Sequence, residues 1–170
     1  MSTTLRRGDE QDLGTLLAFF DEAVAWMVAR GQPDQWGTEP WSANPKRVER
    51  VRALIGSGEL WIAELDGVAA GALIVSDHAD EHVPTVDEPE RYVRLLITSR
   101  ALAGNGIGSL LLDKAKDIAR ADGIELLRVD CWAGGGGKLV AYYERNGFAK
   151  SGTFTVKGWP GQVLTQRVTV

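Results

Sequence analysis

Residues 102–112, "LAGNGIGSLLL", place three glycines in five positions directly before a leucine-rich run. A strand-like segment, "YVRLLIT", lies just upstream, and the apolar residues after the glycines recur at helical spacing. Glycine allows a close approach to the backbone, and a helix N-terminus directs its amides at anions. The stretch therefore predicts a phosphate site made of main-chain amides, with a tight structural turn as the alternative. The residues expected to form it are Gly104, Asn105, Gly106, Ile107, Gly108 and Ser109.

Length, charge and cysteine content limit the class of protein. The 170 residues suffice for one domain, 1–170, with its own core. A net charge of −4 argues against a nucleic-acid partner, which usually meets a basic face. No apolar run approaches the roughly 18 residues that cross a bilayer, so no membrane partner is expected. The single cysteine, Cys131, excludes an internal disulfide and is typical of a cytoplasmic protein.

Apolar periodicity and turn residues predict the order of strands and helices. One helix ends at Gly31, and a second begins at Asn44-Pro45 and ends at Gly56, since proline is tolerated in a first turn. Asp66-Gly67 joins two apolar runs into a hairpin, because this dipeptide accepts the positive φ angles of a type I′ turn. A last hairpin is expected to turn at 158–161. The order β-α-α-β-β-β-α-β-α-β-β predicts an α/β (α+β) fold, a mixed sheet with helices on both faces.

Other phosphate ligands have their own sequence requirements. A nucleoside triphosphate site would need G-x-x-x-x-G-K-[ST], which the chain lacks. A dinucleotide site would need G-x-G-x-x-G after a strand, with an acidic residue about 20 residues later. The spacing here is G-x-G-x-G, and Asp130 closes the next strand. A dinucleotide-binding oxidoreductase therefore stays open, although the chain ends in a hairpin instead of further parallel units.

Two motifs at matching separation carry a resemblance to a known family. "AGNGIG" (103–108) is similar to [QR]-x-x-G-x-[GA] at a strand-to-helix turn, with Ala103 in place of the usual Gln or Arg. "AYYERNGF" (141–148) is similar to a later motif with a tyrosine near "GF", although Gly136 stands where an asparagine is often found. Together with the element order, these motifs make the chain resemble the GNAT superfamily of N-acetyltransferases over nearly its whole length.

The resemblance implies a cofactor, a reaction and a splayed sheet. The glycine loop would hold the pyrophosphate of acetyl-CoA, and no metal is expected. The preceding strand would splay from its neighbour, so that backbone groups of Leu96, Ile97 and Thr98 bind the pantetheine arm. The activity implied is direct transfer of an acetyl group to a primary amine of a small molecule. Family members are often dimers, which leaves a homodimer open.

The same resemblance assigns a proton donor. Tyr143 stands at the position of the family's usual general acid, which protonates the departing thiolate. The alternative is that Tyr143 only packs on a short amphipathic helix. In that case the chain could be a non-catalytic acyl-CoA-binding or sensor domain, which needs the glycine loop but not the tyrosine.

Aromatic residues outside the regular elements indicate the acceptor site. Large aromatic side chains in loops need something to cover them, and the family's acceptor cleft borders these loops. Trp26 and Trp61, in contrast, lie on apolar faces and are expected in the core. The alternative is that the loop tryptophans close the core or a dimer contact. The acceptor-site candidates are Trp36, Trp132 and Trp159, with Asp130 and Asp34 as substrate anchors.

An acidic segment, 77–90, allows two further interpretations. His78 and His82 are four residues apart, but the segment is expected to be a loop, where that spacing does not define a metal site. Its carboxylates could instead form an acidic rim that attracts a cationic amine, or simply be solvated. The general base that neutralises the amine stays unassigned, with Asp130, Asp34 and Glu39 as candidates.

Overall fold

The computed structural model describes residues 2–170 and divides into two compact units, each built from two segments of the chain. The first unit contains the residues up to Ile74 together with Leu95–Leu111. The second contains Val75–Arg94 and Leu112–Val170. The chain therefore passes between the units three times, and two strands and one helix contribute residues to both.

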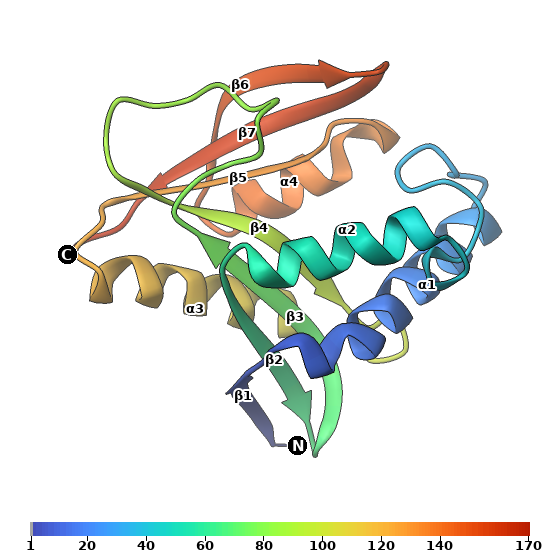
Figure 1. Ribbon diagram of the computed structural model, residues 1–170. Coiled ribbons are helices and arrows are strands. Elements are labelled where there is room, and N and C mark those ends of the chain that lie inside the picture. Colours follow the sequence, from blue (N-terminus) through green and yellow to red (C-terminus); the bar gives the residue numbers. More distant parts are fainter. Residues whose placement is uncertain (1) are drawn as a thin grey trace. The chain divides into compact units, whose positions relative to one another are not determined.

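The predicted order of strands and helices is confirmed (Figure 1). The α-helices are α1 (Leu13–Ala29), α2 (Pro45–Gly56), α3 (Ile107–Ala121) and α4 (Lys138–Arg145). Short 3-10 helices are η1 (Glu10–Asp12), η2 (Trp41–Ala43) and η3 (Gly135–Gly137). The strands are β1 (Thr3–Arg7), β2 (Glu59–Leu65), β3 (Val68–Ser76), β4 (Glu90–Thr98), β5 (Leu126–Trp132), β6 (Ala149–Val156) and β7 (Trp159–Arg167).

The strands form one mixed, splayed sheet in the order β1-β2-β3-β4-β5-β7-β6. Antiparallel pairs join β1 to β2, β5 to β7 and β6 to β7. The parallel register of β4 with β5 runs only from Glu90↔Leu126 to Val93↔Val129, although both strands continue. Beyond that point β5 keeps its pairing with β7, to Trp132↔Gly161. The pairing of β4 with β5 thus ends halfway along β4.

Local sequence signals explain the helices of the first unit. The Asp9 side chain accepts from the backbone while Asp12 bonds back to the Asp9 amide, a reciprocal cap ahead of α1. The Asn44 side chain accepts from two amides of α2, and Pro45 occupies its first turn. Figure 1 shows α1 and α2 side by side. Their apolar faces share a buried cluster with strand residues that includes Leu16, Phe20, Val51, Ile62, Ile74 and Ile97.

The two hairpins turn at dipeptides with positive φ. Asp66 and Gly67 have φ of 52° and 81°, which confirms the predicted turn. The last hairpin turns at Lys157-Gly158, with φ of 49° and 82°, so the predicted turn at 158–161 is wrong. Pro160 pairs with Thr155 inside the β6–β7 ladder, because its missing amide is tolerated next to the turn.

The tryptophans are distributed differently from the prediction. Trp41, from the polar loop, is in the core with 5% of its surface exposed. Trp26 is partly buried and lies between the guanidinium groups of Arg30 and Arg100, at 3.9 Å and 4.2 Å from its ring centre. Trp61 is likewise only partly buried. The expectation that Trp26 and Trp61 belong to the core is wrong, because a bulky ring on an apolar helix face can be covered by cations instead.

Candidate functional site

The glycine loop presents unpaired amides, as expected. Gly104 and Gly106 have φ of 87° and 69°, conformations that L side chains rarely adopt. Within residues 2–170, no acceptor is recorded for the amides of residues 104–109, and the first amide of this region to find one is that of Leu110, on the Gly106 carbonyl. No atom lies within 4 Å of where a Cβ would stand on either glycine. The loop is thus open above six donors at the start of a 15-residue helix.

Neighbouring residues hold the loop in place. Glu22 of α1 accepts hydrogen bonds from the Ser99 hydroxyl at 3.0 Å and the Ala101 amide at 2.9 Å. The Asn105 side chain donates to the Leu102 carbonyl at 2.8 Å, which leaves its own backbone amide free. Gly71 of β3 lets the start of α3 approach, since a Cβ there would stand 2.9 Å from Ile107. The helix N-terminus is therefore fixed before any ligand binds.

The candidate pantetheine strand alternates in burial. Ile97 is buried, whereas Leu96 and Thr98 are partly exposed. All three belong to the part of β4 that lies outside its register with β5. Their backbone groups on that edge are consequently not used by β5, which is the condition for a ligand to pair there as an extra strand.

Tyr143, on α4, is buried and packs edge-on against Tyr142 and Phe148, with ring centres 5.7 Å and 5.8 Å away. Burial raises the pKa of its phenol far above the usual value, with smaller contributions from Cys131, Tyr142 and Asp130. No hydrogen bond is recorded for its hydroxyl. Among residues 2–170, Nε of Arg100 is the only completely buried side-chain polar atom without a hydrogen-bond partner. The Tyr143 hydroxyl is therefore not completely buried and has some contact with solvent. The phenol of Tyr143, with its raised pKa, is therefore neutral at ordinary pH.

Asp130 has a partner that sequence reasoning missed. The hydroxyl of the buried Tyr92 donates to its carboxylate at 2.6 Å. Burial raises the pKa of Asp130, and the Tyr92 hydrogen bond opposes that shift. Next to it, burial raises the pKa of Cys131 to about 12, so its thiol stays protonated. Cys131 is therefore a buried strand residue and no nucleophile.

Trp132 and Trp159 lie on the β5–β7 part of the second unit. Trp132 pairs with Gly161, two residues beyond Trp159 in β7. Trp132 is buried with 8% of its surface exposed, and its ring packs against the backbone of Gly134, where a Cβ would stand 2.3 Å away. Trp159 is partly buried beside Phe154, with ring centres 6.2 Å apart. Trp132 thus has part of its ring covered by the chain itself.

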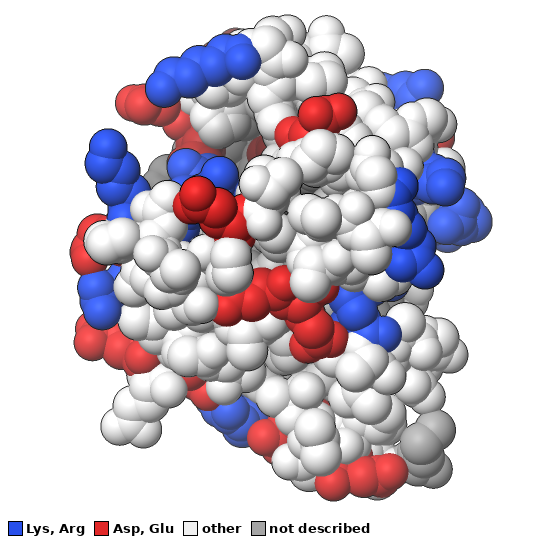
Figure 2. Space-filling view, turned by 90° about the vertical axis from the view of Figure 1, so that its right-hand side faces the viewer, with Lys and Arg blue, Asp and Glu red and all other residues white. Residues whose placement is uncertain are grey.

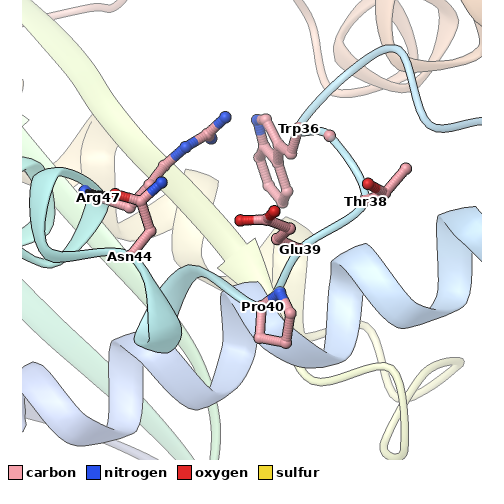
Figure 3. A pocket seen from close by; sticks show the side chains of 7 residues that line it. Trp36, Thr38, Glu39, Pro40, Asn44 and Arg47 are labelled. Atoms are coloured by element: carbon pink, nitrogen blue, oxygen red, sulfur yellow. Dashed lines mark hydrogen bonds between the residues drawn. The ribbon is translucent and has the colours of Figure 1, made fainter.

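Trp36 and Asp34 lie in the loop between α1 and α2. Asp34 is exposed, whereas Trp36 packs on Phe20 and Trp41 with ring centres 5.0 Å and 5.8 Å away. The loop lines a cavity of about 210 Å³ that is open to solvent on one side (Figure 3). Its walls are Trp36, Gly37, Thr38, Glu39, Pro40, Asn44 and Arg47. Of the acceptor-site candidates, only Trp36 lines it.

Three of the six carboxylates in the acidic segment pair with arginines. Asp80 pairs with Arg94 at 2.6 Å, and Glu88 binds Arg167 through two hydrogen bonds. Glu90 binds Arg128 in the same way, with both side chains nearly buried. The predicted rim of free carboxylates is therefore wrong for Asp80, Glu88 and Glu90. On the face shown in Figure 2, acidic and basic side chains are likewise interspersed.

The histidines of the acidic segment have partners of their own, and residues 2–170 offer neither a metal site nor a membrane-spanning helix. His78 bonds Asp77 and Ser76, while His82 lies against the Phe154 ring. Residues 2–170 contain no group of three or more His, Cys, Asp or Glu side chains placed to hold a metal ion. Among the helices of residues 2–170, none has the length and apolar character required to span a membrane.

Comparison with known proteins identifies the family. The sequence profile of the Acetyltransferase (GNAT) family matches residues 17–148. This match contains the glycine loop, β4, β5 and the Tyr143 motif. The chain therefore belongs to the GNAT acetyltransferase family. No curated protein sequence matches it.

Solved structures share the fold at low identity. A PaiA N-acetyltransferase from Thermoplasma acidophilum, in complex with coenzyme A, is 19% identical with a TM-score of 0.72, covering 98% of this chain and 99% of its own. A GNAT acetyltransferase from Listeria monocytogenes is 19% identical with a TM-score of 0.72, covering 98% and 95%. A ribosomal-protein-alanine N-acetyltransferase from Brucella melitensis is 20% identical with a TM-score of 0.64, covering 97% and 99%. These identities establish the fold and leave the acceptor open.

Proposed function

We propose that the chain is an N-acetyltransferase that moves the acetyl group of acetyl-CoA to a primary amine of a small molecule. We further propose that residues 1–170 act as one acetyltransferase domain, since the family match runs through both units. The observation that carries the proposal is the run of six amides, residues 104–109, without an acceptor at the start of α3. Coenzyme A is also the ligand of the PaiA structure.

The residues present fit the pyrophosphate of this substrate. Six donors without an acceptor and a helix dipole favour an anion, and the empty space beside Gly104 and Gly106 admits it. The glycine loop would hold the pyrophosphate, while the free edge of Leu96, Ile97 and Thr98 would bind the pantetheine amides. A strand amide there would also stabilise the negative charge that develops on the thioester oxygen.

The reaction requires two proton movements. The neutral amine attacks the thioester carbon, a C–N bond forms and the C–S bond breaks. The phenol of Tyr143 would protonate the leaving sulfur, and its raised pKa keeps it a donor at neutral pH. The proton lost by the amine goes to a base that we leave unassigned. A non-catalytic sensor domain would not need this proton donor. The role of Tyr143 therefore distinguishes an enzyme from a sensor.

Family membership and the antiparallel β5–β7 pair favour this function over a dinucleotide-binding oxidoreductase. Thermal unfolding with acetyl-CoA, coenzyme A, NAD and NADP at matched concentrations tests the choice. A ligand at 100 times its dissociation constant adds about 2.7 kcal/mol, or several degrees for a chain of this length.

We expect both coenzyme A forms to raise the midpoint and both dinucleotides to leave it unchanged. A shift with NAD or NADP alone would contradict the proposal. Turnover is then measured as release of the coenzyme A thiol with a panel of primary amines. Binding of acetyl-CoA without acetylation of any amine would support the sensor alternative.

A further inference from the structure

Arg47 of α2 carries an unsatisfied guanidinium group. The side chain is partly buried and stacks on the Trp41 ring, 4.3 Å from its centre. Within residues 2–170, no acceptor and no ion pair is recorded for its five N–H donors. The nitrogens of Arg47 nevertheless keep some contact with solvent. In the described part of the chain, the only completely buried side-chain polar atom without a hydrogen-bond partner is Nε of Arg100. A guanidinium held rigidly on an aromatic ring, with its donors free, is preorganised for an anion.

These donors line the cavity of about 210 Å³ in the α1–α2 loop. Figure 3 shows the Arg47 side chain extending from α2 toward Trp36, with the Glu39 carboxylate in the same opening. Arg47 and Glu39 do not form an ion pair with each other, although their charges interact. The cavity therefore presents one unpaired cation and one unpaired carboxylate beside an aromatic ring.

The electrostatics of the cavity favour a carboxylate ligand at Arg47. Desolvation and the nearby Arg50 lower the pKa of Arg47, while Glu39 raises it. An anion that binds the guanidinium offsets the desolvation of Arg47 and its repulsion by Arg50. Asn44, the N-cap of α2, also lines the cavity, so the positive end of the helix dipole lies beside it. Arginine binds a carboxylate through two parallel hydrogen bonds, which lysine does not reproduce.

We propose that this cavity binds the amine acceptor, and that Arg47 selects acceptors bearing a carboxylate, so that the substrates are small α-amino acids. The inference rests on the proposed acetyltransferase function. Arg47 binds the carboxylate, Glu39 lies across the cavity for the ammonium group, and Trp36 contacts the uncharged body. The volume equals about seven water molecules, below the range of drug-sized ligands, which favours a small acceptor.

This assignment replaces the expectation of a purely cationic acceptor. That expectation depended on free carboxylates in the acidic segment, of which Asp80, Glu88 and Glu90 bind arginines. A zwitterion, unlike a simple cation, matches both charges of the cavity. Specificity then comes from the partly buried Arg47 guanidinium, which stays unpaired when an acceptor without a carboxylate binds.

Three acceptors that differ only at the carboxylate test the proposal. They are L-leucine, L-leucinamide and 3-methylbutylamine, assayed at saturating acetyl-CoA by release of the coenzyme A thiol. We expect kcat/KM for L-leucine to exceed that for the other two by about 10- to 100-fold, since charged hydrogen bonds are lost with them. Equal values for the three acceptors would overturn the proposal.

Two variants with matched charge change locate the effect. Arg47→Met keeps an unbranched apolar stem on Trp41, and Arg52→Met removes an exposed arginine of the same helix whose charge does not shift the pKa of Arg47. We expect Arg47→Met to raise KM for L-leucine by about 10- to 100-fold, with KM for 3-methylbutylamine unchanged. Arg52→Met should leave both KM values unchanged. An unchanged KM for L-leucine in Arg47→Met would overturn the assignment.

A direct binding measurement separates this inference from the proposed function. If acetyl-CoA binds but none of the three amines is acetylated, the function fails and calorimetry decides the site. L-leucine that binds wild type and Arg52→Met but not Arg47→Met supports the site. L-leucine that binds none of them, or all three alike, overturns it. Circular dichroism of each variant confirms that it is folded.

Discussion

The hydroxyl of Tyr92 donates a hydrogen bond of 2.6 Å to the carboxylate of Asp130, joining β4 to β5 at the end of their paired stretch. Both side chains lie in the second unit. A partly buried carboxylate with one phenolic donor is only partly compensated for the loss of water. The pair therefore has a cost in stability that depends on pH.

We expect Asp130→Asn to stabilise the protein at neutral pH. Burial raises the pKa of Asp130 above its unfolded value, so the folded state keeps the proton longer. The contribution of protonated Asp130 to the free energy of unfolding is complete below the ordinary carboxyl pKa. It is lost as pH rises through the raised pKa of the folded state. Asparagine retains an acceptor for Tyr92 and has no charge to bury. Urea unfolding midpoints should show an advantage at pH 7 that narrows toward pH 4.

The control for this prediction is Asp117→Asn, which removes an exposed carboxylate from α3. Its midpoint should follow that of wild type at each pH. An Asp130→Asn variant that is less stable than wild type at pH 7 would mean that Tyr92, Arg94 and His82 compensate the charge fully.

Glu90→Gln should be strongly destabilising. Glu90 binds Arg128 through two hydrogen bonds of 2.6 Å and 3.0 Å, with side chains only 10% and 4% exposed. Removal of one partner leaves a buried charge, at a cost of about 3–5 kcal/mol in the free energy of unfolding. Glu88→Gln breaks the equivalent but exposed pair with Arg167 and should not change stability measurably. Equal effects of the two substitutions on the denaturant midpoint would contradict this account.

Gly106→Ala should separate backbone strain from ligand binding. Its φ of 69° makes alanine unfavourable by roughly 1–2 kcal/mol, and the added methyl group would stand over the free amides. Gly123→Ala, at the other end of α3, has the same φ of 69° and equally open surroundings. Both variants should lose similar stability, but only Gly106→Ala should lose the thermal shift with acetyl-CoA. Similar loss of that shift in both would assign the glycines a structural role.

Tyr143→Phe should lower kcat by about 100-fold with little effect on the KM for acetyl-CoA. The neighbouring Tyr142→Phe removes a partly exposed hydroxyl and should leave kcat unchanged. Because burial raises the pKa of Tyr143, the wild-type rate should not fall through loss of this proton up to about pH 10. An unchanged kcat in Tyr143→Phe, measured by thiol release, would remove the tyrosine from the mechanism.

Local signals in the sequence were sufficient for most of the backbone. Asp66-Gly67, Asn44-Pro45 and the glycine loop each restrict the backbone to a few conformations, and the structure has the predicted turn, helix start and helix there. The last hairpin was misplaced because Lys157 adopts a positive φ that its residue type rarely shows.

Side-chain partners were harder to predict because they depend on contacts distant in sequence. Nothing local distinguishes Arg47 from the other 18 basic residues, since its free donors result from stacking on Trp41. Tyr92 and Asp130 are 38 residues apart and meet only through the β4–β5 register. Trp26 was predicted to be a core residue because apolar periodicity does not show when a ring is covered by cations, here Arg30 and Arg100.

The division of each unit into two chain segments also constrains the order in which the protein can fold during synthesis. The first unit needs Leu95–Leu111 as well as the residues up to Ile74, and the second needs Val75–Arg94 as well as the C-terminal segment. A nascent chain emerging from the ribosome therefore completes neither unit in a single continuous stretch. Val75–Arg94 must wait, already synthesised, until β5 and β7 follow. A chaperone that shields exposed apolar strands would act on Val75–Arg94 during this time. A chain truncated shortly after residue 111 would leave this segment without β5 and β7.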